Sequence, residues 1–400
     1  MPQLVIEGQI VRDNLLQAIN RFMEERKLRY SIVDFHLGAR NEDPSSVIID
    51  SDIDPEGMDR LSELLKDKGA WLLGREQGNP VLLPSEKDRT VPDNFYSTTH
   101  HPTELFLNGK WVPVRDMRMD AVLSVEGGGV VCRKLRDIKK GDLVVCGTRG
   151  IRIHPPTEKT RLEEPFAFMG AEVSSERRTD LAARTLAAEM KRIGAAKGKI
   201  VFVAGPVLVH TGGGEAFSSL IKKGYVHAFL GNNAIAVHDI EADLYGTSLG
   251  VDLQTGLPAS GGHKNHMRAI NAISKAGSIK EAVEQGVLKS GIMFNLARAG
   301  VPFSLAGSIR DDGPLPDTEM DLLKAQENYA ALLKGAELVV MLSSMLHSIG
   351  AGNMLGSQVK VVCVDINPAV VSKLRDRGSM QTLGIVTDAG LFVKALDENL

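Results

Sequence analysis

The chain of 400 residues is poor in cysteine and lacks the short motifs of several large enzyme classes. Its three cysteines, Cys132, Cys146 and Cys363, are widely spaced and form no C-x-x-C pair. We therefore expect buried, reduced thiols in a cytoplasmic protein. G-x-S-x-G, Walker A and H-E-x-x-H motifs are also missing, so nothing in the sequence supports Ser/His/Asp hydrolysis.

An excess of charge and long apolar runs are missing too. The formal net charge is −3, so no global basic field attracts nucleic acid. No apolar run reaches the length of a bilayer, and the N-terminal stretch does not resemble a signal peptide. We expect a soluble protein with no nucleic-acid partner and no membrane partner.

Glycine, in contrast, is abundant. The chain has 40 glycines in 400 residues, which exceeds the usual fraction of about 7%. They cluster in loops that follow apolar strands, which favours an α/β protein whose functional site is built from loops.

The order of patterns predicts three domains. Residues 1–88 show strand, helix, two strands, helix and strand, the βαββαβ order of a ferredoxin-like α+β unit. WLLG or VLLP supplies the last strand. Such a unit often regulates or dimerises, and simple structural support is an equally good interpretation. Residues 89–160 carry short β-like runs between glycine turns, which predicts a small β-barrel or sandwich.

Residues 161–400 alternate helical patterns with short apolar strands. This alternation predicts a doubly wound parallel sheet with right-handed crossovers. The predicted strands are KIVFVAG, YVHAFLG, VPFSLAG, AELVVMLS and VKVVCVDINP, and LGIVTDAG supplies a further strand-end loop.

The stretch Val201–Glu241 is the most informative part of the chain. A buried strand ends at Gly205, and Gly212, Gly213 and Gly214 precede an amphipathic helix. Glycines at a strand-to-helix turn let a phosphate approach the backbone N–H groups of the helix. The spacing is not G-x-G-x-x-G, so a plain tight turn explains the glycines equally well.

Polar residues follow the other predicted strands. SIRDDG follows VPFSLAG, Ser344 to His347 follow AELVVMLS, and Asp365 ends VKVVCVD. Ligands of open α/β sheets bind at these strand ends, and a carboxylate there suits a ribose diol. The alternative for Asp365 is a cap on the turn before Pro368.

The segment GGHKNH, ending at His266, stands before a predicted helix. Two histidines three residues apart could bind a metal, but no third ligand completes a zinc pattern, so we expect no metal. Acid–base chemistry or substrate binding by Lys264, His263 and Asn265 is one interpretation. A structural cap with solvated basic residues is the other.

Long motifs in this chain resemble those of the archaeal-type ornithine cyclodeaminases, which carry the LOR/SDH conserved region. They are YSTTHHPTELFLNGKWV, GAEVSSERR, LGNNAIAVHDIE, GGHKNH, SIRDDGPLPD and MLHSIGAGNML, and the resemblance spans essentially the whole chain. LGNNAIAVHD also resembles the NAD loop of deoxyhypusine synthase, which implies a nucleotide-binding domain of that type.

The resemblance implies an NAD-dependent, redox-neutral lyase that converts L-ornithine to L-proline and ammonia. It implies no arginine hydrolysis, because fused relatives keep that activity in a separate N-terminal domain. A homodimer or homotetramer is also implied. The NAD contacts carried over by motif are Asn233, Ala234, Asp312, Ser344, Met345, Leu346, His347, Asp365, Asp388 and Ala389.

Two other functions fit the same motifs. One is a different NAD-dependent enzyme acting on an amino acid or polyamine, such as a dehydrogenase, which would accumulate NADH. The other is a non-catalytic regulator that binds NAD and senses an amino acid through the ferredoxin-like unit.

Overall fold

The structure is a computed structural model, and it describes residues 3–8, 15–37, 45–66, 70–72, 78–154, 177–259, 262–311, 313–377 and 382–400. The chain divides into two compact units, Met1–Glu163 and Glu164–Leu400. The exact limits of the three predicted domains stay a prediction.

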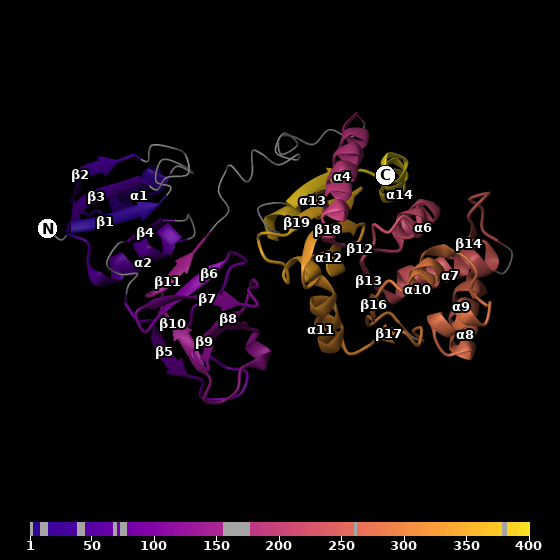
Figure 1. The fold of residues 1–400 in the computed structure, drawn as a ribbon, viewed down its shortest axis with the longest axis horizontal. Helices are drawn as coiled ribbons and strands as arrows, with labels where there is room; N and C mark the ends of the chain where they lie inside the picture. The colour runs from indigo at the N-terminus through magenta and orange to yellow at the C-terminus, as the bar shows by residue number, and fades with distance from the viewer. Residues whose placement is uncertain are drawn as a thin grey trace. The chain divides into compact units, whose positions relative to one another are not determined.

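The first unit begins with a four-stranded antiparallel sheet in the order β2-β3-β1-β4 (Figure 1). Together with two helices this is the ferredoxin-like arrangement that the sequence predicted. Ile6, Ile19, Ile49 and Leu61 are fully buried in its core. AWL forms the last strand, which overlaps the first of the two predicted alternatives. The elements are β1 (Gln3–Gly8), α1 (Leu15–Glu25), β2 (Tyr30–His36), β3 (Ser45–Ser51), α2 (Pro55–Lys66) and β4 (Ala70–Leu72).

The rest of the first unit is β-rich, as predicted. Its strands join in one seven-stranded sheet in the order β11-β6-β7-β9-β8-β10-β5, with one described 3-10 turn, η2 (Leu135–Asp137). Asn108 and Gly109 both have positive φ, which a two-residue hairpin turn requires. VLLP forms β5 here. The strands are β5 (Val81–Pro84), β6 (Thr103–Leu107), β7 (Lys110–Arg115), β8 (Val122–Glu126), β9 (Gly129–Arg133), β10 (Leu143–Cys146) and β11 (Ile151–Ile153).

The second unit contains a seven-stranded, all-parallel sheet in the order β17-β16-β13-β12-β18-β19-β20. It confirms the predicted doubly wound sheet. β17, only two residues long, was not predicted because so short a strand has no apolar period. The strands are β12 (Lys199–Ala204), β13 (Ala228–Asn232), β16 (Phe303–Ala306), β17 (Thr318–Glu319), β18 (Ala336–Leu342), β19 (Lys360–Asp365) and β20 (Thr382–Val386).

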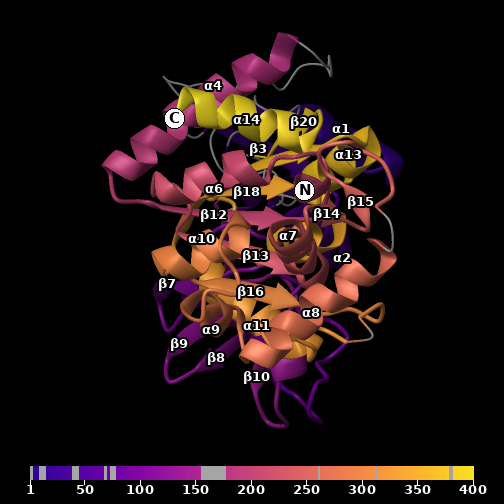
Figure 2. The ribbon, with the colours of Figure 1, turned by 90° about the vertical axis from the view of Figure 1, so that its right-hand side faces the viewer.

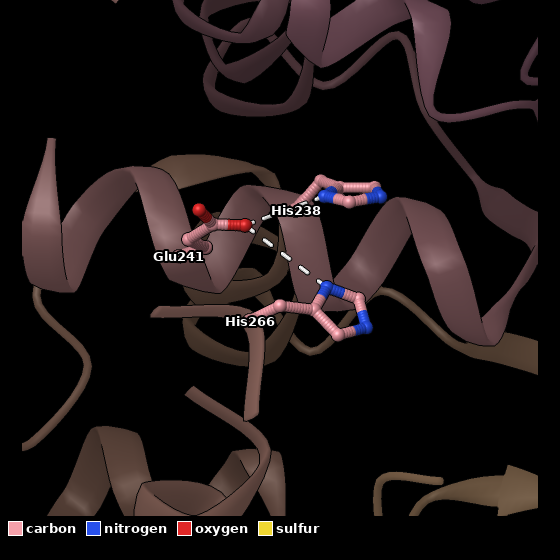
Figure 3. A group of neighbouring side chains, drawn as sticks. All are labelled: His238, Glu241 and His266. Atoms are coloured by element: carbon pink, nitrogen blue, oxygen red, sulfur yellow. Dashed lines mark ion pairs between the residues drawn. The ribbon is translucent and has the colours of Figure 1, made fainter. Parts of the chain in front are cut away.

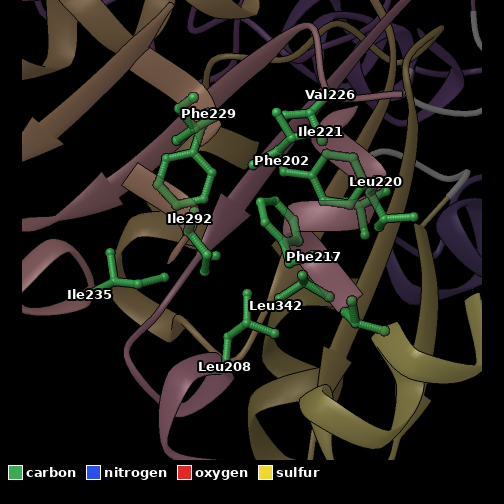
Figure 4. Close-up of a cluster of buried hydrophobic side chains, with 14 of the residues drawn as sticks. Phe202, Leu208, Phe217, Leu220, Ile221, Val226, Phe229, Ile235, Ile292 and Leu342 are labelled. Atoms are coloured by element: carbon green, nitrogen blue, oxygen red, sulfur yellow. The ribbon is translucent and has the colours of Figure 1, made fainter. Parts of the chain in front are cut away.

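Helices cover both faces of this sheet. Along β12, Ile200 and Phe202 pack into one buried cluster, and Val201 and Val203 pack into another. Figure 4 shows part of the first cluster, with Phe217 packed edge-on against Phe202. Figure 2 shows β18, β12, β13 and β16 one below another, in the order that they have in the sheet.

The helices of the second unit are α4 (Arg177–Ala195), α5 (Val207–His210), α6 (Gly214–Lys222), α7 (Asn233–Tyr245), α8 (Asn265–Ala276), α9 (Ile279–Glu284), α10 (Gly291–Ala299), α11 (Leu322–Leu333), α12 (Met345–Gly352), α13 (Pro368–Arg377) and α14 (Ala389–Asn399). A small hairpin, β14 (Thr247–Ser248) and β15 (Val251–Asp252), and a 3-10 turn, η4 (Gly262–Lys264), lie between α7 and α8.

The strand order reverses between β12 and β18. The chain runs from β12 outward to β17 on one side and then resumes at β18 on the other side. Such a switch point opens a crevice at the carboxyl ends of the strands, where doubly wound folds bind their ligands. Gly205 and Ser343 meet there. A Cβ built on Gly205 would lie 2.2 Å from the Ser343 carbonyl oxygen, so only glycine fits.

The three cysteines are buried and unpaired, as predicted. No helix in the described parts of the chain is both long enough and apolar enough to cross a membrane.

Candidate functional site

The residues predicted to bind a cofactor follow the carboxyl ends of five parallel strands. Asn233 follows β13, Ser344 follows β18, and Asp388 follows β20. Because these strands are parallel, their carboxyl ends share one edge of the sheet. We call this the carboxyl edge of the sheet.

Asn233 fixes the loop that follows β16. Its amide nitrogen donates to the Asp311 carboxylate at 3.0 Å. Its amide oxygen accepts from the Leu315 backbone N–H and from the Thr318 hydroxyl. Asn233 is 2% exposed as a residue, and both its amide oxygen and its amide nitrogen are hydrogen-bonded within the protein. Ala234 is half-buried next to it, and Asp312 lies outside the described residues.

The loop after β18 leads directly into α12. Ser344 is the residue before the helix, and its hydroxyl lies 3.1 Å from His347 Nδ1. Met345 and Leu346 are exposed in the first turn, where an apolar part of a ligand can cover them. Burial lowers the pKa of His347, so its imidazole is neutral around pH 7.

Two carboxylates stand at the next strand ends. Asp365 ends β19 and accepts the Asn367 backbone N–H at 2.8 Å, as its capping interpretation requires. This bond occupies Oδ1 and leaves lone pairs for a ribose. Asp388 caps α14 by accepting the Leu391 N–H at 2.9 Å, and Ala389 is buried behind it.

The Gly212–Gly214 loop leads into α6, as predicted. Gly212 has a φ of +73°, and a Cβ on Gly213 would lie 2.9 Å from Gly390 Cα. A Cβ on Gly214 would touch nothing within 4 Å. The first two glycines are therefore required by turn geometry and by packing against α14, and the third leaves the start of α6 open.

The residues of the segment predicted to carry catalysis lie in two different environments, one exposed and one buried. Lys264 is exposed, and His263 lies in η4. Asn265 is buried, and its amide donates to the Thr247 hydroxyl at 3.0 Å. The main chain at Gly262 packs closely against the main chain of Gly250. A Cβ built on Gly262 would lie 2.3 Å from the Gly250 carbonyl oxygen.

His266, at the end of the same segment, joins a group from α7. His238 and Glu241 are three residues apart on α7, and His266 projects from the first turn of α8 (Figure 3). His238 Nδ1 lies 3.5 Å from Glu241 Oε2, and His266 Nδ1 lies 4.0 Å from the same oxygen. We call these three residues the His–Glu cluster.

Within the described residues, the His–Glu cluster is a donor set that could hold a metal ion, with all three donor atoms within 4.8 Å of one another. The expectation of no metal considered only His263 and His266 and stays a prediction.

The Glu241 carboxylate is fully buried and held by the β14–β15 hairpin. Oε1 accepts from the Thr247 hydroxyl at 2.8 Å and from the Gly250 N–H at 2.9 Å. Oε2 accepts from the Leu249 N–H at 3.1 Å. Burial alone raises the pKa of Glu241, but His238 and these donors outweigh it and hold the pKa below its usual range. Glu241 is therefore an anion.

His210, from the end of α5, extends the cluster into a row of three rings. Ring centroids are 4.7 Å apart for His210 and His238, and 5.1 Å apart for His238 and His266. His210 Nδ1 lies 2.7 Å from the Ser248 hydroxyl. Burial, with His238 adding to it, lowers the pKa of both His210 and His266. Both rings are therefore neutral around pH 7.

Asp311 connects this row to the loop after β18. Its charge acts on both His266 and His347, raising the pKa of each against the effect of burial. Its carboxylate is fixed by the Ser308 N–H at 2.7 Å as well as by Asn233. The row thus lies near the loops that follow β16 and β18.

Asp239, next to His238 on α7, holds the first turn of α10 in place. Its carboxylate accepts the N–H groups of Ile292 and Met293 at 2.8 and 2.7 Å, at the start of α10. Burial, against those two hydrogen bonds, raises its pKa to about 7.

Sequence reasoning did not commit to His210, Glu241, His266 or Asp311 as site residues. The i, i+3 spacing of His238 and Glu241 was a usable signal, because it places both on one helix face. His210 follows a predicted strand end, which was a second signal.

Three family descriptions match the chain. The C-terminal Rossmann-fold region of ArgZ-like arginine dihydrolases matches residues 184–396, and the first C-terminal region of the same proteins matches residues 102–183. The conserved region of LOR/SDH bifunctional enzymes matches residues 2–101. The segment 230–239, predicted as a nucleotide-binding loop, forms the end of β13 and the first half of α7, and its likeness to deoxyhypusine synthase stays a prediction.

Two curated relatives cover nearly all of the chain. An ornithine cyclodeaminase from Methanocaldococcus jannaschii is 46% identical over 100% of this chain and 96% of its own length. The bifunctional arginine dihydrolase/ornithine cyclodeaminase AgrE from Nostoc sp. is 47% identical over 99% of this chain. The chain spans 57% of the length of AgrE.

A solved structure of AgrE in a ternary complex with ornithine and NAD+ covers all of this chain at 45% identity, with a TM-score of 0.55, and 57% of that protein is matched. Sequence identity at this level over the whole of this chain shows common descent. The chain belongs to the family formed by the archaeal ornithine cyclodeaminases and the C-terminal part of the ArgZ-like arginine dihydrolases.

Proposed function

We propose that this chain is an NAD-dependent ornithine cyclodeaminase that converts L-ornithine to L-proline and ammonia. The observation that carries the proposal is 46% identity to an archaeal ornithine cyclodeaminase over all of this chain and 96% of that protein. A relative in this family forms a complex with ornithine and NAD+. The doubly wound sheet and its carboxyl edge are the architecture that this cofactor requires.

The residues present fit a dinucleotide. The switch point between β12 and β18 has no side chain on Gly205, so backbone groups line the crevice. Helix α12 begins at this edge without a side-chain cap, so its first N–H groups are suited to phosphate. We assign the ribose to Asp365. The other residues that would hold NAD are Asn233, Ala234, Asp312, Ser344, Met345, Leu346, His347, Asp388 and Ala389.

NAD, when bound, accepts a hydride from Cα of ornithine and returns it later, so the net reaction is redox-neutral. The protein must hold ornithine so that its δ-amine reaches Cα within the same molecule, at high effective concentration. It must also take a proton from an ammonium group and deliver one to the departing ammonia. Neutral imidazoles on the carboxyl edge suit that work.

Lys264, His263 and Asn265 remain our candidates in the GGHKNH segment for acting on the substrate, by direct contact or by positioning. Lys264 is exposed and can turn toward the substrate carboxylate as a mobile cation. Asn265 is better placed to position the hairpin through Thr247 than to touch substrate directly.

One assay tests the function directly. Purified protein is incubated with NAD and L-ornithine, and proline, ammonia and NADH are quantified together. We expect equal amounts of proline and ammonia and no net NADH. Accumulating NADH would indicate an ordinary dehydrogenase, and NAD binding without any turnover would indicate a regulator.

We also propose a cytoplasmic homodimer or homotetramer. Three buried free thiols support a reducing compartment. Strand β2 lies at an edge of its sheet with Ile32, Val33 and Phe35 exposed, and such an edge is suited to pairing with another copy. Light scattering at micromolar concentration tests this, and a monomer would contradict it.

A further inference from the structure

The Glu241 carboxylate is a buried anion whose hydrogen-bond donors in the described part of the chain are a hydroxyl and two backbone N–H groups. Its side chain is 0% exposed. Oε1 already accepts two hydrogen bonds, and Oε2 accepts one. One lone pair of Oε2 is left, and both imidazoles of the His–Glu cluster face it (Figure 3).

The two facing atoms are the Nδ1 atoms. Both are buried and make no hydrogen bond to any residue that the structure describes, and His238 is 4% exposed as a residue. An Nδ1 that faces a carboxylate oxygen must carry a proton, because two lone pairs would repel each other. The carboxylate therefore selects the tautomer in which Nε2 carries the free lone pair and can act as a base.

His266 is the member of the cluster that a substrate can reach. Its side chain is 33% exposed, whereas that of His238 is 6% exposed. It also feels the Asp311 charge from the loop that Asn233 holds, next to the predicted cofactor contacts. Its distance of 4.0 Å to Glu241 is long, as catalytic contacts often are before substrate binds.

We propose that His266 is the general base that takes a proton from the α-ammonium group of the amino-acid substrate, and that buried Glu241 is its positioning residue. The inference rests on the proposed function. An ammonium group cannot lose a hydride from its Cα until it is deprotonated, so an amine-oxidising site needs such a base.

The proton balance is simple. The N–H bond of the ammonium breaks, its proton binds His266 Nε2, and the amine keeps the electron pair. The resulting imidazolium holds two protons, and its Nδ1–H points at the Glu241 anion, which stabilises the charge. The proton later leaves with ammonia. His210, at the far end of the row of rings, accepts the positive charge poorly, because burial and the neighbouring His238 lower its pKa.

The test compares wild type with His266→Ala and Glu241→Gln at saturating NAD. We expect His266→Ala to lower kcat/KM for ornithine by about 100-fold or more with unchanged NAD affinity. Added imidazole should restore activity, because the side chain is partly open to solvent. His154→Ala, which removes an imidazole paired with Glu104 in the first unit, serves as the control and should keep wild-type turnover.

Glu241→Gln separates positioning from packing. Loss of the anion should move the acid limb of the pH–kcat/KM profile to lower pH, because the Glu241 charge raises the pKa of His266. A purely structural role would lower activity at every pH and leave the limb in place. Thermal melting identifies a variant that fails to fold, and the His266→Ala result with imidazole then decides alone.

Three results would overturn the inference. The first is wild-type kcat/KM in folded His266→Ala. The second is loss of that activity with no rescue by imidazole. The third is wild-type activity abolished by a chelator and restored by zinc, which would make the cluster a metal site. Wild-type protein that binds NAD but forms no proline would instead refute the proposed function, and the inference with it.

Discussion

Replacing Gly205 by alanine should damage the switch point of the parallel sheet. The new Cβ would lie 2.2 Å from the Ser343 carbonyl oxygen and 3.1 Å from Ser344 Cβ. Ser343 cannot move aside cheaply. Its φ is +46°, unfavourable for a non-glycine residue, and its N–H is bonded to the Val364 carbonyl at 2.9 Å. The clash therefore falls on backbone and not on a flexible side chain.

The magnitude follows from this rigidity. An ordinary contact of a Cβ with an oxygen is above 3 Å, so the backbone must move by about 1 Å. Overpacking of this kind costs about 1–3 kcal/mol. In a unit of this size each kcal/mol lowers Tm by about 2–4 °C. We expect Tm to fall by about 2–12 °C. The displaced loop carries the start of α12, so NAD affinity should fall about 10-fold or more, which equals about 1.4 kcal/mol.

Calorimetry measures both quantities on the same samples, and Gly214→Ala is the matched control. Gly214 begins α6, and a Cβ there meets no atom within 4 Å. Alanine at that position should leave Tm unchanged or raise the stability by about 0.4–1 kcal/mol. If Gly205→Ala melts and binds NAD like wild type, the close approach of the two loops does not exist in solution.

Three further substitutions test separate parts of the second unit. Glu189, 1% exposed, binds Arg192 and Lys360, and the Arg192 hydrogen bonds lower its pKa. Glu189→Gln should cost about 1–3 kcal/mol at pH 7. In urea titrations that difference should shrink below pH 4.5. A carboxylate whose pKa is lower in the folded state stabilises the fold at pH values above its unfolded-state pKa. This stabilisation is lost as the pH falls through the folded-state pKa. Asp365→Ala should weaken NAD binding by about 1–3 kcal/mol; unchanged affinity in calorimetry would remove Asp365 from the site. Lys264→Ala should keep NAD affinity and lower proline formation by about 100-fold, and near wild-type turnover would make that loop structural.

The periodic parts of the chain were predictable because each element repeats a local rule. The βαββαβ order and the alternation beyond residue 177 both follow from apolar spacing, and the structure confirms both. The hairpin β14–β15 has no such signal. Its strands are two residues long, and it exists because Glu241 gathers the donors of Thr247, Leu249 and Gly250 around one buried carboxylate. A contact of that kind has no period to detect.

The candidate site shows the same division between local and non-local information. Loops after parallel strands could be assigned to the carboxyl edge from sequence, because strand direction alone puts them there. The catalytic role of the GGHKNH segment stays a prediction, and the residue of this segment that faces Glu241 is His266, two positions beyond Lys264. The choice among neighbours on one segment depends on where α8 meets α7. The contact of His266 with Glu241 depends on that packing, because the two residues lie 25 positions apart in the sequence.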